Sequence, residues 1–176
     1  MQTELTRTGK LLEPDGRLAQ IGWSRQPLLD CNLEKARFYA LRPFQRLRIK
    51  RWDYYAVFTP HNFFSATIAD LGYAGNIFVY AMELASGDLH EEGLVIPFAK
   101  GILLARNSDE GESHLENDRA RLDFRVLPES RSLSVSWPSF HGGRGLQADL
   151  TLSCPPGCES ITIVIPIGKR RFYYNR

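Results

Sequence analysis

Residues 121–137 read RLDFRVLPESRSLSVSW, and they set the fold class. Apolar and polar residues alternate on both sides of a turn at residues 128–130. Successive side chains of a strand point to opposite faces, so each half predicts a strand with one face on a core and the other in water. The short proline-containing turn between the halves predicts an antiparallel hairpin.

The same alternation continues toward the end of the chain. Residues 146–152 place apolar side chains at every second position. The row formed by Ile161, Ile163, Ile165 and Ile167 repeats the pattern, and these isoleucines are expected to face a core.

Three segments in the middle of the chain are apolar on both faces. Residues 52–58, 63–69 and 76–82 are rich in aromatic and β-branched residues, which favour strands. Because large side chains occupy both faces, we expect one face to pack inside a barrel and the other against a covering element.

Turn residues separate these runs at short intervals, so consecutive strands are expected to pair as antiparallel hairpins. The fold class predicted is all-β: an antiparallel meander of about nine or ten strands that forms a β-barrel or a strongly curved sandwich. At most one short helix is expected, from Asn32 to Leu41, with Pro43 preventing a longer one.

Length and composition exclude several classes of protein. The 176 residues are 43% hydrophobic and 24% charged, which is typical of a folded domain and excludes intrinsic disorder. A net charge of +2 provides no general attraction to nucleic acid or to an anionic membrane. We find neither a signal peptide nor an apolar run long enough to span a membrane, so a cytoplasmic location is expected.

Cysteine and histidine residues are too few and too dispersed to predict a metal site. The three cysteines include Cys154 and Cys158, which flank a Pro-Pro-Gly turn, while zinc would need two further ligands. We therefore expect no metal and no cofactor, and leave open whether this pair is bridged.

Four stretches carry a resemblance to a known family. They read KRWDYYAVF at residues 50–58, FFSATIADLGYAG at 63–75, GWSRQPL at 22–28 and FYYN at 172–175. Together they resemble the bacterial family called domain of unknown function 2804, over nearly the whole chain. Members of that family are about twice this length, so the chain is similar to an N-terminal half.

The resemblance implies a fold and a ligand class, but no established activity. The family is similar to lipocalin-like proteins, among them carotenoid hydratase-like and tocopherol cyclase-like ones. That implies a single lipocalin-like β domain over residues 1–176, an apolar small ligand and a missing C-terminal domain. The strand-like run at residues 168–176 would then close a barrel, pair with another subunit or continue into further chain.

Two carboxylates are candidate catalytic acids. Asp70 ends an apolar strand, where desolvation would raise its pKa and suit it to general acid catalysis. Its alternative role is to accept hydrogen bonds from the glycine-containing turn that follows. Asp53 lies among aromatic residues and would protonate an alkene or orient a ligand hydroxyl. Its alternative is an ion pair with the neighbouring basic residues.

Aromatic residues and one histidine are the candidate ligand-binding residues. Tyrosine hydroxyls can donate hydrogen bonds inside a cavity, although such residues also occur as ordinary core side chains. The expected ligand-binding set consists of Trp52, Tyr55, Tyr73, Tyr80, Trp137 and His141.

A basic segment, residues 35–51, has seven Lys or Arg residues and no acid. Interleaved aromatic side chains make a nucleic-acid or lipid-headgroup surface conceivable, but acidic segments elsewhere favour an ordinary solvated face. We expect no nucleic-acid partner.

Three functions follow from these observations. The leading hypothesis is binding of a hydrophobic small molecule of lipid or isoprenoid type. The alternatives are a hydratase, cyclase or isomerase with Asp70 or Asp53 as proton donor, and an interaction domain that self-associates or pairs through an exposed edge strand.

Overall fold

Two four-stranded antiparallel sheets form the larger part of the protein. The structure, a computed structural model, describes residues 3–168 and 171–176. The first sheet has the order β4-β5-β6-β7, with β4 (Arg51–Phe58), β5 (Asn62–Asp70), β6 (Ala74–Glu83) and β7 (Leu89–Pro97). The second has the order β11-β10-β9-β8, with β8 (Gly111–Glu116), β9 (Arg121–Leu127), β10 (Ser130–Trp137) and β11 (Leu146–Ser153).

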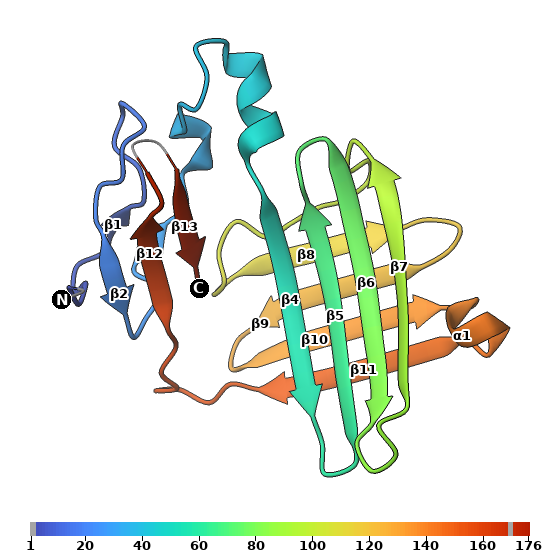
Figure 1. Cartoon of the computed structure of the whole chain (residues 1–176). Helices are drawn as coiled ribbons and strands as arrows, with labels where there is room; N and C mark the ends of the chain where they lie inside the picture. Colours follow the sequence, from blue (N-terminus) through green and yellow to red (C-terminus); the bar gives the residue numbers. More distant parts are fainter. Residues whose placement is uncertain (1–2, 169–170) are drawn as a thin grey trace.

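The two sheets pack face to face, and the strands of one cross those of the other (Figure 1). Their inner faces form one hydrophobic core in which Phe124 and Trp137 are the largest fully buried side chains. Ile68 and Ile77 from the first sheet pack into the same core. Each such side chain contributes about 1.5–3 kcal/mol when it leaves water, so this core is the main source of stability.

The hairpin that the opening stretch predicts is confirmed. Strands β9 and β10 pair with Leu133 opposite Phe124 and Val135 opposite Leu122, so the predicted apolar positions share the inner face. The chain reverses at Pro128 and Glu129, where Glu129 adopts a φ of 59°.

The predicted all-β antiparallel fold is confirmed as a sandwich, and the β-barrel alternative is not formed. Among the described residues, no strand belongs to both four-stranded sheets. After β7, Phe98 and Ala99 both adopt positive φ values, of 57° and 53°. This sharp turn directs the chain away from the edge of the first sheet, so that β8 begins the second sheet instead of pairing with β7.

A smaller sheet lies beside the sandwich and joins distant parts of the chain (Figure 1). Its order is β13-β12-β2, with β13 (Phe172–Asn175), β12 (Thr162–Pro166) and β2 (Gly22–Ser24). A parallel pair, β1 (Gly9–Lys10) and β3 (Leu29–Asp30), completes this part of the fold. These short strands bring the total in the described part of the chain to thirteen, above the nine or ten expected.

The small sheet has its own core, and the isoleucine row is not in it. Val164 of β12 is buried with Leu5, Leu12 and Leu29 in a second hydrophobic cluster. The expectation that the isoleucines at 161–167 face a core is wrong, because Thr162 and Val164 hold the buried face while Ile161, Ile165 and Ile167 are exposed and Ile163 is only half-buried.

Within residues 3–168 and 171–176, helical structure is limited to three short elements. The helix expected from Asn32 to Leu41 is reduced to the 3₁₀ turn η1 (Leu33–Lys35). Pro43, expected to end it, instead lies in the first turn of η2 (Arg42–Arg48), where the missing N–H of a proline leaves no hydrogen bond unmade. The third element is α1 (Phe140–Gly143). None of the helices in the described ranges has the length and apolar character needed to cross a membrane.

The shared core makes a direct prediction about stability. Leu122 has no exposed surface, so Leu122→Ala should lower the free energy of unfolding by about 2–5 kcal/mol through lost burial and a residual cavity. Leu127 ends the same strand but is 43% exposed, and Leu127→Ala should cost less than about 1 kcal/mol. Urea denaturation of both variants measures the difference, and equal losses would contradict the described packing.

Candidate functional site

A cleft of about 1070 Å³ lies between the small sheet and the open end of the sandwich. Strand β4 forms one wall, β13 forms the opposite wall, and the segment that leads into β8 crosses between them. β4 and β13 are each hydrogen-bonded to a single neighbour, so both are edge strands. The cleft is therefore bordered by two sheet edges rather than enclosed by a barrel.

The aromatic part of the cleft comes from these two edges. Trp52 and Tyr54 point to one face of β4, and the Trp52 ring lies 6.0 Å from that of Tyr173 on β13. Tyr55 points to the other face and meets Phe124 of the core edge-on at 5.2 Å. Burial raises the pKa of Tyr55 to about 12, so its hydroxyl remains protonated at neutral pH and can donate a hydrogen bond.

Asp53 also lies in the cleft, on the inner face of β4. The Ser113 hydroxyl of β8 donates a hydrogen bond to its Oδ2 atom at 2.8 Å. Desolvation by burial raises the pKa of this carboxyl, while Ser113 and the positive charges of Arg176 and Arg131 act more weakly in the opposite sense. Asp53 is thus a carboxylic acid that holds its proton more tightly than usual, beside an aromatic wall.

Two arginines supply positive charge to the same cleft. Arg131, on the inner face of β10, donates to the carbonyl oxygens of Ser108 and Ser130 at 2.9 and 3.0 Å. Arg176 donates to the Asn107 side chain at 3.4 Å. Within the described part of the chain, neither has a carboxylate within salt-bridge distance, whereas Arg106 is paired with Asp30 at 3.0 Å. The unpaired guanidinium groups suit an anionic group on a ligand.

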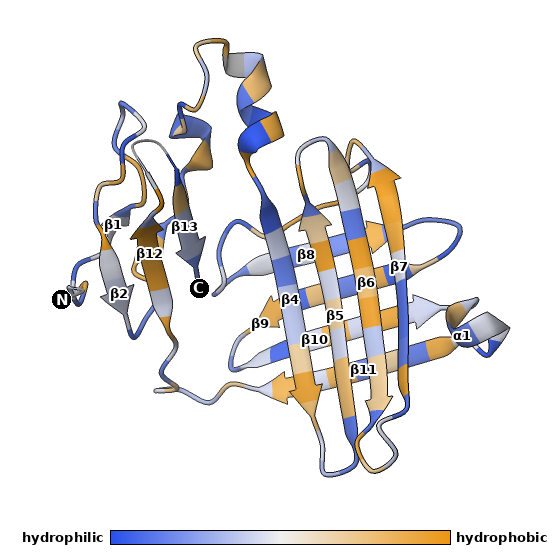
Figure 2. Cartoon of the chain, in the orientation of Figure 1, coloured by the Kyte–Doolittle hydropathy of each residue, from blue (hydrophilic) through white to orange (hydrophobic). Residues whose placement is uncertain are grey.

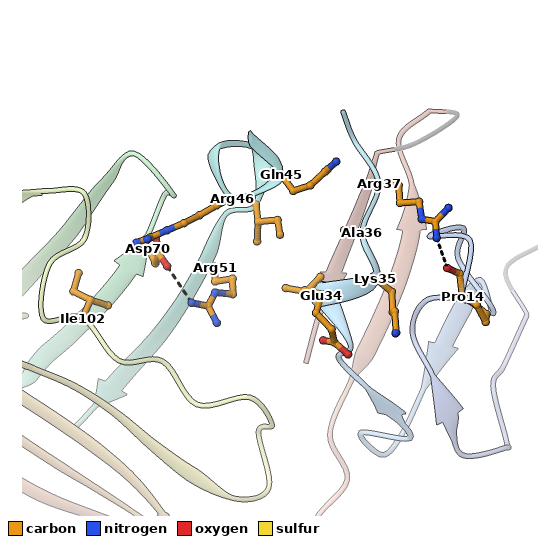
Figure 3. A pocket seen from close by; sticks show the side chains of 12 residues that line it. Pro14, Glu34, Lys35, Ala36, Arg37, Gln45, Arg46, Arg51, Asp70 and Ile102 are labelled. Carbon is orange, nitrogen blue, oxygen red and sulfur yellow. Dashed lines mark hydrogen bonds and ion pairs between the residues drawn. The ribbon is translucent and has the colours of Figure 1, made fainter. Parts of the chain in front are cut away.

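Asp70 lies outside this cleft, in a smaller polar cavity of about 490 Å³. Figure 3 shows its carboxylate directed at Arg51, and the two form an ion pair at 3.0 Å. Its second oxygen accepts the Gly72 N–H at 2.8 Å, which is the turn contact considered as its alternative role. Gly72 itself has a φ of +83°, and a Cβ there would lie 2.1 Å from the Arg46 carbonyl oxygen.

The other predicted ligand-binding residues are dispersed over the molecule. Tyr73 is exposed, with the Lys50 ammonium 4.0 Å from its ring centroid. The Tyr80 hydroxyl donates to Glu91 at 2.9 Å on the outer face of the first sheet. Trp137 is fully buried in the sandwich core.

His141 lies at the far end of the sandwich, in the turn before β11. Its ring centroid is 3.5 Å from that of His90, and its backbone N–H donates to Glu92 at 2.6 Å. The structure therefore brings together Trp52, Asp53 and Tyr55, while the remaining predicted site residues lie elsewhere.

Sequence reasoning missed Ser113, Arg131 and Arg176. Ser113 and Arg131 occupy inward positions of their strands, where apolar residues dominate, and a polar residue at such a position is a usable signal of a buried site. No local sequence pattern marks Arg176 as a site residue, because its position depends on the pairing of β13 with β12.

Cysteine residues also reach this cleft. Cys31, Cys154 and Cys158 all line it, and all three are free, so Cys154 and Cys158 are not bridged. Burial raises the pKa of the Cys31 thiol, which makes it a poor nucleophile. Residues 3–168 and 171–176 contain no group of three His, Cys, Asp or Glu side chains placed to hold a metal ion.

The fold and the cleft define the class of protein: a β-sandwich whose two sheets cross, with a smaller β-sheet beside one open end. Comparison with known families identifies the chain within that class. The chain belongs to the family described as Domain of unknown function (DUF2804), whose profile matches residues 2–176. No curated protein and no solved structure matches it.

The environment of Asp53 predicts how stability depends on pH. A carboxyl whose pKa is raised by folding costs stability as the pH rises through that pKa, because the folded state disfavours its charged form. Asp53→Asn removes this cost, so the variant should be more stable than the wild type at pH 7, and the difference should shrink toward pH 3.8.

Urea denaturation at several pH values measures this difference. Asp70→Asn is the matched control, because it removes a charge from the ion pair with Arg51 and should cost up to about 1 kcal/mol at neutral pH. An Asp53→Asn variant that is destabilised equally at all pH values would contradict the buried environment described.

Proposed function

We propose that the protein binds a small molecule with an apolar body and an anionic group in the cleft between β4 and β13. The observation that carries the proposal is the presence of an aromatic wall and two arginines without carboxylate partners in one cavity. Aromatic side chains bury the body of such a ligand, and guanidinium groups pair with its carboxylate or phosphate.

Cavity size supports the same class of ligand. Pockets for small molecules usually enclose about 300–1,000 Å³, and the cleft, at about 1070 Å³, has room for a lipid or isoprenoid chain. The sandwich interior offers no comparable space, because Phe124 and Trp137 fill it. Binding is therefore assigned to the cleft beside the sandwich, not to its interior.

A fluorescent fatty acid tests the proposal. Titration of the protein with cis-parinaric acid should give saturable binding, and Arg131→Met should weaken it by roughly tenfold or more through loss of a charge-assisted contact. Arg125→Met is the matched control, because Arg125 lies on the outer face of the neighbouring strand β9 and pairs with Glu112. Its affinity should stay unchanged.

The methyl ester of the same probe separates the role of charge from that of apolar contact. It should bind the wild type more weakly than the acid, and Arg131→Met should reduce this difference, because Arg176 alone then attracts the carboxylate. Absence of saturable binding, or an equal effect of Arg125→Met, would refute the proposal.

A second candidate function is acid catalysis on the bound ligand, as in a hydratase, cyclase or isomerase. The raised pKa of Asp53 favours it, since a carboxyl that holds its proton more tightly than usual in an apolar setting is suited to act as a general acid toward a double bond. Asp70 is a weaker candidate, because its two oxygens are engaged by Arg51 and the Gly72 N–H.

Mass spectrometry of the natural ligand tests catalysis. Molecules extracted from purified protein are incubated with wild type, Asp53→Asn and Asp70→Asn, and their conversion is followed over time. Conversion should stop in Asp53→Asn and continue in Asp70→Asn. An extract that the wild type leaves unchanged would eliminate the enzymatic alternative.

A further inference from the structure

The outer face of the first sheet, which we call the aromatic face, carries large side chains that are exposed in the described part of the chain. Figure 2 shows this sheet in front of the second one, with hydrophobic stretches along its strands. Outward positions on β4 hold Trp52, Tyr54 and Phe58, and Phe58 is 70% exposed. On β7 they hold Leu89 and Val95, which are 48% and 75% exposed. Exposed apolar areas of this extent are rare on monomeric proteins and mark interaction sites.

The outer face of the second sheet carries polar side chains, as is usual for a face in contact with solvent. One row across it consists of His114, Asp123, Ser134 and Asp149, joined in adjacent pairs by side-chain contacts of 2.6 and 2.7 Å. The two sheets share one core, and the contrast between their outer faces is what we expect if the first meets a partner and the second meets water.

Two buried hydroxyl groups lie at the centre of the aromatic face. Ser65 and Thr67 lie on β5 between the aromatic rows of β4 and β6, and they are 1% and 2% exposed. Neither side-chain oxygen has a hydrogen-bond partner among the described residues. Because the flanking rows cover these hydroxyls, the surface that this face offers to a partner consists of the large side chains of the neighbouring strands.

We propose that the aromatic face binds the same face of a second copy of this chain, as a two-fold symmetric dimer. Its exposed large side chains extend across the sheet from β4 to β7, a breadth that suits a partner surface of equal size, and each partner of a standard stable interface contributes roughly 800 Å². Face-to-face packing of sheets is already the way in which the protein builds its core, and a two-fold pair repeats it across the molecular surface.

Charge favours a second copy over other partners. Arg48 and Lys50 lie where β4 begins, while Glu83 and Asp88 lie in the β6–β7 hairpin at the opposite end of the face. A two-fold axis between the faces and across the strands brings the basic end of one copy to the acidic end of the other. Such complementarity does not arise with a uniformly anionic membrane.

Sedimentation velocity of the full chain over roughly 1–100 µM tests the proposal. The wild type should form a dimer whose dissociation constant rises by about tenfold or more in Leu89→Glu and in Val95→Glu, since each variant buries an unpaired charge. Neither position lines the cleft, so failure of this proposal leaves the ligand proposal standing. Both side chains are exposed in the single chain, and unchanged circular dichroism verifies that each variant folds.

Leu127→Glu is the matched control, because Leu127 is 43% exposed on the outer face of the second sheet. It should leave the dissociation constant unchanged. A wild type that stays monomeric at the highest concentration overturns the proposal, as does a dimer that neither face variant weakens. A monomer that instead binds phosphatidylcholine–phosphatidylglycerol vesicles, and loses this binding in Val95→Glu, also overturns it by assigning the face to a membrane.

Discussion

Leu122, Phe124 and Trp137 fill the space between two crossed sheets, and the rest of the molecule depends on that packing. Side chains alternate between the two faces along each strand, so the residues that face the core determine which residues face outward. Once the apolar positions of β9 and β10 turn inward, Asp123 and Ser134 must turn outward. The polar face, the aromatic face and the inward position of Asp53 all follow from this single constraint.

The cleft arises because the sandwich is open where a barrel would be closed. β4 has one hydrogen-bonded neighbour, and its free edge lets side chains from both of its faces reach the same cavity. Trp52 and Asp53, adjacent in sequence, therefore line one site although they belong to opposite faces. A closed barrel would have separated them into interior and exterior.

Much of the fold was predictable, because period-two alternation depends only on neighbouring residues. The hairpin of β9 and β10 and the strand content follow from it. Alternation does not distinguish a sandwich from a barrel, since that difference depends on the backbone turn at Phe98 and Ala99. For the isoleucine row, both faces of β12 are apolar, so alternation could not tell which face would be buried.

The candidate site was predictable only where its residues are close in sequence. Trp52, Asp53 and Tyr55 lie on one strand, and a single motif contained all three. Ser113 and Arg131 reach the same cavity through strand register between distant segments, and no local pattern reports that register. The central strands carry large side chains on both faces, as the sequence predicts. The sequence pattern does not identify what would cover the aromatic face.

Strand β12 has a consequence for the order in which the protein folds. Both four-stranded sheets are meanders whose strands pair with their neighbours in the chain, so each can form from local hairpins. The small sheet instead pairs Gly22 with Val164. Closing so long a loop costs conformational entropy before any stabilising contact forms. The pairing of β12 with β2, which attaches the β12–β13 hairpin and so completes the cleft, is therefore expected to form after the two meanders. The ligand binding that we propose for this cleft would thus depend on the part of the fold that is joined by the longest chain closure.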